Sequence, residues 1–175
     1  MLSLNLLLPH RLLPLFTLLA LALPASAATL PVPAQFTTIQ AAINAAVNGD
    51  TVLIADGTYT GPGNVDLDFG GRNINVTSQN GPTKTIIDCG GSAGTNHRGF
   101  YLHSGETNAV ISGLTIQNGY GGPPSGYDAG GGICNIGSGL TIQNCVLRSN
   151  VAGQGGAFYN SVYSSVVSVW TEPFV

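Results

Sequence analysis

Two carboxylates separated by one residue, Asp66 and Asp68, carry the clearest chemistry in the sequence. They alternate with apolar residues between Val65 and Phe69, a pattern typical of a strand that buries one face. On such a strand both carboxylates point outward, about 7 Å apart. Carboxylate oxygens are hard ligands of the kind calcium prefers, and calcium takes about six to eight of them. The pair therefore predicts either a calcium site formed by Asp66 and Asp68 or a polar outer face that discourages strand pairing.

Acid–base chemistry is the other use of such residues. A glycoside hydrolase needs two acids about 5 to 10 Å apart across a cleft, and Asp66, Asp68 and Asp88 supply the residue types but no evident cleft. Histidines form a second polar group near one predicted strand, with these members: His97, Arg98, His103 and Glu106. This group could form a polar site in a loop, although histidines at loop edges are more often solvated than catalytic.

The segment Gly119 to Tyr127 is rich in glycine and proline and is expected to be an insertion between structural repeats. Loops on one side of a repeat protein commonly carry its binding residues, and exposed aromatic rings could stack on sugars. Tyr120, Tyr127 and Asp128 are therefore our candidate ligand contacts, and the expected partner is a polysaccharide or cell-surface glycan. The alternative is that both tyrosines only shape the loop.

Residues 1–27 have the layout of a secretory signal peptide. Its parts occur in the usual order: weakly basic His10 and Arg11, apolar Leu12 to Leu23, and small Ala25, Ser26 and Ala27 at the cleavage site. The apolar run is too short for a transmembrane helix of about 20 residues. We therefore expect a mature chain that begins near Ala28, is secreted or displayed at the cell surface, and has no transmembrane helix.

The net charge of the predicted mature chain excludes some classes of binding partner. Without Arg11 the chain keeps four basic and eight acidic residues, a formal charge of −4. So weakly acidic and charge-poor a protein is unsuited to nucleic acid, and its few cations attract an acidic polysaccharide only weakly.

Cysteine usage adds little chemistry. Cys89, Cys134 and Cys145 are an odd number in a chain expected to enter an oxidising compartment, so at least one thiol has no partner within the chain. Their spacings match no zinc motif. We expect small buried residues, with a disulfide as the alternative.

The spacing of apolar residues changes from that of a helix to that of strands at Asp50, and these elements must position the groups above. Before Asp50, these apolar residues recur with helical spacing: Ile39, Ala42, Ile43, Ala46 and Val47. Thr37 or Thr38 can cap the start of the helix. Asn48-Gly49 is expected to end this helix. After it, short strand patterns follow between turn residues: Thr51 to Ile54, Val65 to Phe69, Ile74 to Thr77, Thr85 to Asp88, Phe100 to His103, Val110 to Ser112 and Leu114 to Gln117.

A repeat indicates how these strands are arranged. The residues SGLTIQN occur at 112–118 and again at 138–144. In a solenoid, stacking the two copies would place Leu140 on Leu114 and Asn144 on Asn118, about 4.8 Å apart in a parallel sheet. Identical amides in register can form a hydrogen-bonded ladder. We expect like-on-like stacking of these copies.

A second pair of motifs has nearly the same spacing. GGGICN begins at Gly130 and GGAFYN begins at Gly155. The segment Thr85 to Cys89 resembles a degenerate earlier copy, which would place Thr85 one coil before Thr115. In that arrangement Cys89 and Cys145 lie two coils apart, at roughly 10 Å, beyond the reach of a disulfide.

These motifs resemble a known superfamily. TIQAAINAAVNGDTVLIADGTY is similar to the N-terminal cap and first coil of pectin-lyase-like right-handed parallel β-helix proteins. GGGICN and GGAFYN are similar to the GGA tetrapeptides of chlamydial polymorphic outer membrane protein repeats, although Leu147-Arg148-Ser149-Asn150 stands in place of their FxxN tetrapeptide. The resemblance covers about residues 36 to 160. It implies the fold but leaves the activity open, because that fold hosts lyases, hydrolases, adhesins and spacers.

The lyase branch of the superfamily implies a calcium ion that bridges enzyme and uronate, and commonly an arginine that acts as the base. The predicted mature chain offers only four cationic residues for that role and for holding a polyanion: Arg72, Lys84, Arg98 and Arg148.

The expected organisation has four parts. They are a signal peptide (1–27), an N-terminal cap with an amphipathic helix (28–50), parallel β-helix coils (51–160) and an irregular tail (161–175). The tail has no glycine or asparagine and repeats nothing earlier, so it is either an unusual terminal strand or the product of a lost reading frame, and we favour the second.

The sequence as a whole predicts an all-β protein, a right-handed parallel β-helix (solenoid) with a short N-terminal capping α-helix. Its expected role is that of a secreted or cell-surface repeat module that is structural, adhesive or glycan-contacting and has no catalytic activity or cofactor. The alternative is a pectate-lyase-like polysaccharide lyase, assisted by calcium, or a glycoside hydrolase acting on acidic polysaccharide.

Overall fold

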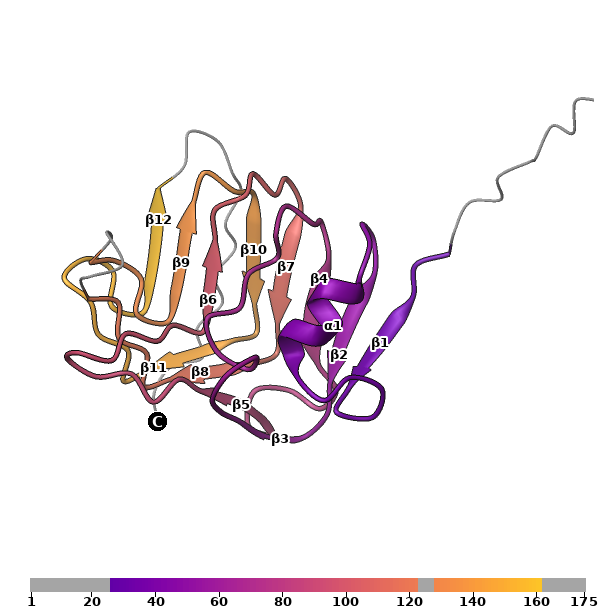
Figure 1. The fold of residues 1–175 in the computed structure, drawn as a ribbon, viewed down its shortest axis with the longest axis horizontal. Helices are drawn as coiled ribbons and strands as arrows, with labels where there is room; N and C mark the ends of the chain where they lie inside the picture. Colours follow the sequence, from indigo (N-terminus) through magenta and orange to yellow (C-terminus); the bar gives the residue numbers. More distant parts are fainter. Residues whose placement is uncertain (1–25, 123–127, 162–175) are drawn as a thin grey trace, which may run out of the picture.

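Three parallel sheets wind around one apolar core in the computed structural model, which describes residues 26–122 and 128–161 (Figure 1). Sheet A contains β1 (Thr29–Val32), β2 (Thr51–Ile54), β4 (Asn75–Ser78), β7 (Ala109–Ser112) and β10 (Leu140–Gln143). Sheet B contains β3 (Gly57–Tyr59), β5 (Thr85–Asp88), β8 (Thr115–Gln117) and β11 (Val146–Arg148). Sheet C contains β6 (Phe100–Leu102), β9 (Ile133–Ile136) and β12 (Phe158–Ser161).

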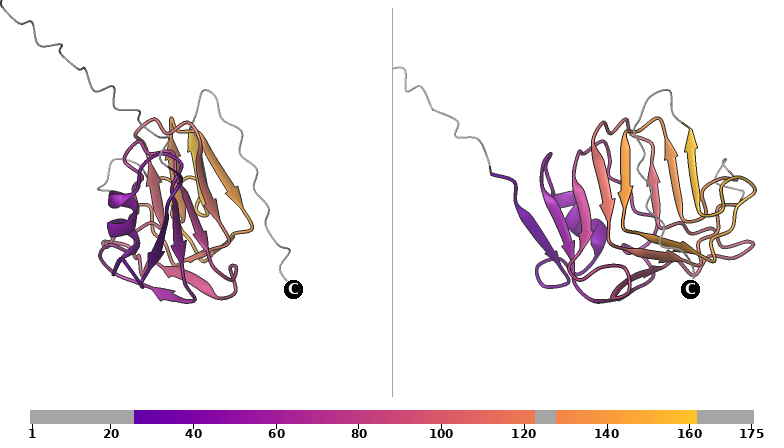
Figure 2. Two further views of the ribbon diagram at one scale, coloured as in Figure 1. Left: turned by 90° about the vertical axis from the view of Figure 1, so that its right-hand side faces the viewer. Right: turned by 180° about the vertical axis from the view of Figure 1, so that it is seen from behind.

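From β4 to β12 the chain visits sheets A, B and C in turn and then continues into the next coil. Each strand pairs in parallel with the strand one coil away, so the order in sheet A is β1-β2-β4-β7-β10. The other two views show the same stacks from the side and from behind (Figure 2). This arrangement confirms the predicted parallel β-helix.

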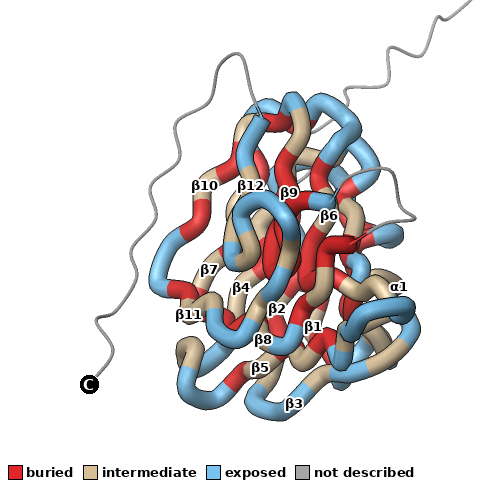
Figure 3. The backbone as a smooth tube through the Cα atoms, turned by 90° about the vertical axis from the view of Figure 1, so that its left-hand side faces the viewer, coloured by how far each residue is buried: buried red, intermediate tan, exposed pale blue. Residues whose placement is uncertain are grey.

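Columns of branched apolar side chains explain why the coils stack. In sheet A, Val52 pairs with Val76, Val76 with Ile111, and Ile111 with Ile142. All four side chains are buried, and the buried positions follow the strands as red segments in Figure 3. Stacked β-branched residues pack well on one another because their shapes repeat from coil to coil.

The only helix of the described residues, α1 (Ile39–Ala45), follows β1 and packs against β1 and β2. Thr38 caps it by accepting a hydrogen bond from the amide of Ala41 (3.2 Å). Ile39, Ala42 and Ile43 are buried as predicted, but Val47 is 60% exposed. The helix ends earlier than predicted because the carboxylate of Asp50 accepts the amide hydrogen of Val47 (2.9 Å) and turns the chain.

The predicted stacking of the two SGLTIQN copies is wrong. Leu140 pairs with Ala109 in sheet A, whereas Thr115 of the first copy pairs with Val146 in sheet B. The turn residues Asn118 and Asn144 therefore lie at different corners, each with a left-handed φ of 56° and 50° respectively. The same strand sequence suits either sheet, because both sheets bury alternate side chains in the same core.

The spacing of the glycine motifs is confirmed. Ile133 pairs with Phe158, and Asn135 pairs with Asn160 in the same register. The segment Thr85–Asp88 does lie one coil before β8, but Ile86, instead of the predicted Thr85, is opposite Thr115. The degenerate copy is therefore in the predicted sheet and shifted by a single position.

The segment Val65 to Phe69 keeps its predicted alternation but does not form a continuous strand. Val65, Leu67 and Phe69 are buried, and only isolated bridges occur, from Val65 to Pro62 and from Leu67 to Phe100. Asp66 has a left-handed φ of 54°, which interrupts the extended conformation that a strand requires.

Candidate functional site

Asp66 is held at a corner of the β-helix by the next coil. Its Oδ1 accepts the amide hydrogen of Arg98 (2.7 Å), and its Oδ2 lies 2.6 Å from Nδ1 of His97. The side chains of Asp66 and His97 are both partly exposed. The carboxylate thus has a protein partner on each oxygen, and a cation would have to compete with them.

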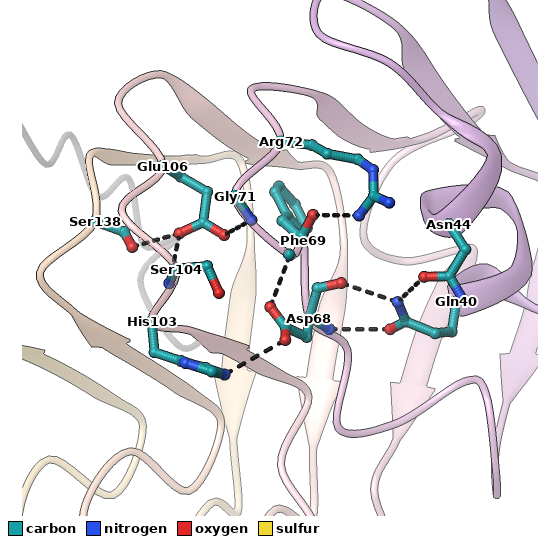
Figure 4. Close-up of polar contacts among 11 residues, drawn as sticks. Gln40, Asn44, Asp68, Phe69, Gly71, Arg72, His103, Ser104, Glu106 and Ser138 are labelled. Atoms are coloured by element: carbon teal, nitrogen blue, oxygen red, sulfur yellow. Dashed lines mark hydrogen bonds and ion pairs between the residues drawn. The ribbon is translucent and has the colours of Figure 1, made fainter.

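Asp68 has the same kind of environment (Figure 4). Its Oδ1 accepts the amide hydrogen of Gly70 (2.8 Å), and its Oδ2 lies 3.4 Å from Nε2 of His103. Gln40 of α1 brackets its backbone, donating from Nε2 to the carbonyl (2.9 Å) and accepting the amide hydrogen at Oε1 (2.9 Å). Asp68 therefore connects the helix to the end of β6.

The structure gives both histidines of the predicted polar group a carboxylate, but in two separate pairs. No group of three or more His, Cys, Asp or Glu side chains placed to hold a metal ion occurs in residues 26–122 and 128–161. The proposed calcium ligands Asp66 and Asp68 are instead linked to His97 and His103, respectively. These partly exposed His–Asp contacts can link neighbouring coils.

Glu106 differs from the histidines because it is buried. Its Oε1 accepts the amide hydrogen of Gly71 (2.8 Å), and its Oε2 accepts that of Ser104 (3.3 Å) and the hydroxyl hydrogen of Ser138. Figure 4 shows these three partners converging on one carboxylate from three successive coils. A buried carboxylate with this many donors is a structural junction.

Aromatic contacts on the outer side of sheet C involve the same region. The rings of Tyr101 and His103 lie 4.3 Å apart at 30°, and the guanidinium of Arg98 lies 5.7 Å from the Tyr101 ring centre. Arg98 is buried and donates from Nε to the carbonyl of Ala129 (3.1 Å). The Tyr101 ring therefore already contacts His103 and Arg98, two side chains of the protein itself.

The candidate ligand contacts in the insertion have different surroundings. Tyr120 is half-buried, and its amide donates to the carbonyl of His97 (2.7 Å). Asp128 is exposed, but its Oδ1 accepts the amide hydrogen of Gly153 (2.6 Å). Tyr127 lies outside the described residues.

A groove of about 280 Å³ lies on the outer face of sheet A and was not predicted. Its six lining residues come from four strands: Thr51, Asn75, Thr77, Val110, Ser112 and Gln143. Pairing puts them in two rows, with Thr51, Asn75 and Val110 in one and Thr77, Ser112 and Gln143 in the other. Five of the six carry uncharged hydrogen-bonding groups, and none is ionisable.

The outward alternation of each strand was the available signal for this groove. It could not be used from sequence alone, because one row joins residues as far apart as Thr77 and Gln143 and its composition depends on the coil register. The misplaced register of SGLTIQN would have put Gln143 over Gln117, on another sheet.

The outer face of sheet B is charged. Gln117 donates from Nε2 to Oδ2 of Asp88 (2.7 Å), and Arg148 donates from Nε to Oε1 of Gln117 (2.8 Å). Partial burial raises the pKa of Asp88, but hydrogen bonds from Asn118, Gln117 and the Gly90 amide, together with the charge of Arg148, outweigh it. The net effect is a pKa below the ordinary value of 3.8.

The cysteines are free and buried, as expected. Burial raises the pKa of Cys89 to about 12, with smaller contributions from the charges of Asp66 and Asp88. Burial also raises the pKa of Cys145 to about 11 and raises that of Cys134. Such thiols are packing residues and poor nucleophiles at neutral pH.

Comparison with known proteins returns no relative. No protein-family model, no curated protein and no solved structure matches the chain. No helix in the described part of the chain is long and apolar enough to cross a bilayer. The function therefore has to be inferred from the geometry of the chain itself.

Proposed function

We propose that this protein is a secreted or cell-surface β-helix module that contacts a neutral glycan through the groove on sheet A and does not catalyse a reaction. The observation that carries the proposal is the pair of rows of uncharged side chains across β2, β4, β7 and β10. Hydroxyl and amide groups both donate and accept hydrogen bonds, as sugar hydroxyls do. Val110 adds an apolar surface for a ring face.

The direction of the rows suits a chain-like ligand. They run across the strands, so successive side chains of a row lie about 4.8 Å apart, the spacing of neighbouring strands. A glycan lying along the β-helix axis would meet similar groups on each coil. An adhesive or structural role would follow from many weak contacts of this kind.

Charge favours a neutral ligand over an acidic one. The groove contains no cation, and three of the four basic residues outside the predicted leader donate hydrogen bonds within the protein: Arg72, Arg98 and Arg148. A polyuronate would therefore find little positive charge to bind.

The proposal is tested by titrating the protein with neutral oligosaccharides and with oligogalacturonate, with and without calcium, using calorimetry. We expect binding of at least one neutral series, weakened about fivefold by Thr77→Val, since one hydrogen bond is worth roughly 1 kcal/mol. Thr58→Val, on exposed Thr58 of β3, is the matched control and should bind normally.

Two outcomes would contradict the proposal. Absence of binding to every neutral series would leave a purely structural module. Calcium-dependent release of unsaturated products from polygalacturonate would instead support the lyase alternative.

A further inference from the structure

Asp50 is a buried carboxylate whose partners are both backbone amides. Its Oδ1 accepts the amide hydrogen of Ala28 (2.7 Å), and its Oδ2 accepts that of Val47 (2.9 Å). These hydrogen bonds lower the pKa of Asp50, so the group is ionised at neutral pH. The proposed glycan groove makes no use of this site.

Both the amide and the carbonyl of Ala28 are hydrogen-bonded to the β-helix. Its carbonyl accepts the amide hydrogen of Thr51 (2.8 Å), and β1 begins at the next residue. Ser26, Ala27 and Ala28 are exposed and have no regular secondary structure. The Ala27–Ala28 peptide bond is therefore accessible and lies beside the buried carboxylate.

We propose that peptidase cleavage between Ala27 and Ala28 creates an α-ammonium group that Asp50 binds as an ion pair. Hydrolysis consumes one water: the new carboxylate leaves on Ala27, and the amine of Ala28 takes up a proton. The nitrogen that donates to Asp50 as a neutral amide then donates as a cation. The inference rests on the predicted secretory leader and is independent of glycan binding.

Only one position of the cut would place the new ammonium group at Asp50. Cleavage one residue earlier would place the ammonium on Ala27, beyond the nitrogen that contacts Asp50. Cleavage one residue later would remove that nitrogen. Only the cut before Ala28 converts this hydrogen bond to a charge-assisted one between two ions, which is stronger than a bond from a neutral donor.

The ion pair would tie together three parts of the N-terminal region. Asp50 lies directly before β2, Val47 follows α1, and Ala28 directly precedes β1. Removal of the leader would therefore stabilise the first coil. Folding before export would lack this contribution.

The first test locates the cut. The full precursor is expressed in a secreting host, and the exported protein is analysed by intact mass and N-terminal sequencing. We expect a chain that begins at Ala28. A chain that begins at any other residue overturns the inference.

The second test measures the ion pair in the exported protein. Selective acetylation of the α-amine removes its charge and should lower Tm by about 2 to 4 °C in a domain of this size. Acetylation should have no such effect in Asp50→Asn, whereas Asp56→Asn, a change at an exposed aspartate, should retain it. Equal losses in the parent and in Asp50→Asn would overturn the inference.

A third measurement does not depend on a folded variant. The rate of α-amine labelling as a function of pH gives the pKa of that amine, which is ordinarily about 7.7 to 8.0. An adjacent carboxylate stabilises the charged amine, so a raised value is expected. An unshifted value means that no ion pair forms.

Discussion

At the scale of single residues, the polar groups of this protein mostly serve the stacking of coils. Glu106 is the clearest case, because its two oxygens collect donors from Gly71, Ser104 and Ser138, which lie in successive coils. The paired Asp66 and His97 do the same at the surface. Burial distinguishes the two, since a buried carboxylate costs more to leave unsatisfied.

Replacing Glu106 with glutamine should therefore destabilise the fold. The new amide hydrogens would face the donors that the carboxylate now satisfies, and we expect a loss of about 1 to 3 kcal/mol in the free energy of unfolding. Urea denaturation followed by circular dichroism measures it. Asp128→Asn is the control, because Asp128 is exposed and should lose clearly less. Similar losses in both variants would refute the junction role.

At the scale of elements, each sheet has its own outer surface although all three share one core. Sheet A presents the uncharged groove, whereas sheet B presents the row formed by Asp88, Gln117 and Arg148. Hydrogen bonds along this row hold the pKa of Asp88 low. A lowered pKa stabilises the folded state above the ordinary pKa of an aspartate, and this contribution is lost as pH falls through the lowered value.

Acid unfolding tests this row directly. Asp88→Asn should flatten the fall in Tm below about pH 4, because the group that must be protonated is gone. Gln117→Leu should shift the fall to higher pH, since it removes one hydrogen bond that keeps Asp88 ionised. Thermal melts from about pH 2 to about pH 6 give both curves. An unchanged acid limb in Asp88→Asn would show that the row contributes nothing.

The elements also differ in how far their position and pairing could be predicted from the sequence. The helix from Ile39 and the pairing of Ile133 with Phe158 were predictable, because helical spacing and glycine corners have few alternatives. The place of SGLTIQN was not, because its alternation fits sheet A and sheet B equally. The groove was hidden for the same reason: it exists only once the register of four strands is known.

At the scale of the whole molecule, each coil is stabilised mainly by the coils on either side of it. β4 pairs with β2 on one side and β7 on the other, whereas β1 pairs with β2 alone. Interactions limited to neighbouring coils make a solenoid approximately a sum of local units. Central coils should therefore open less often than the first one.

Hydrogen exchange measured by mass spectrometry should show this gradient. We expect peptides that contain β4 and β7 to exchange more slowly than the peptide that contains β1. The N-terminal ion pair should reduce the difference, because it fixes the residue before β1. Uniform protection from β1 to β7 would mean that the coils open as one unit.

The coils of this β-helix contain different numbers of residues, and this difference matters for anyone who wishes to alter the protein. Val52, Val76 and Ile111 occupy successive places in one column of sheet A, yet the chain from Val76 to Ile111 is clearly longer than the chain from Val52 to Val76. Extra chain is absorbed at the corners, and the strands keep their pairing. A foreign peptide inserted at the corner that contains exposed Gly94 should therefore be displayed outward without disturbing the sheets, which makes this β-helix a scaffold for grafting.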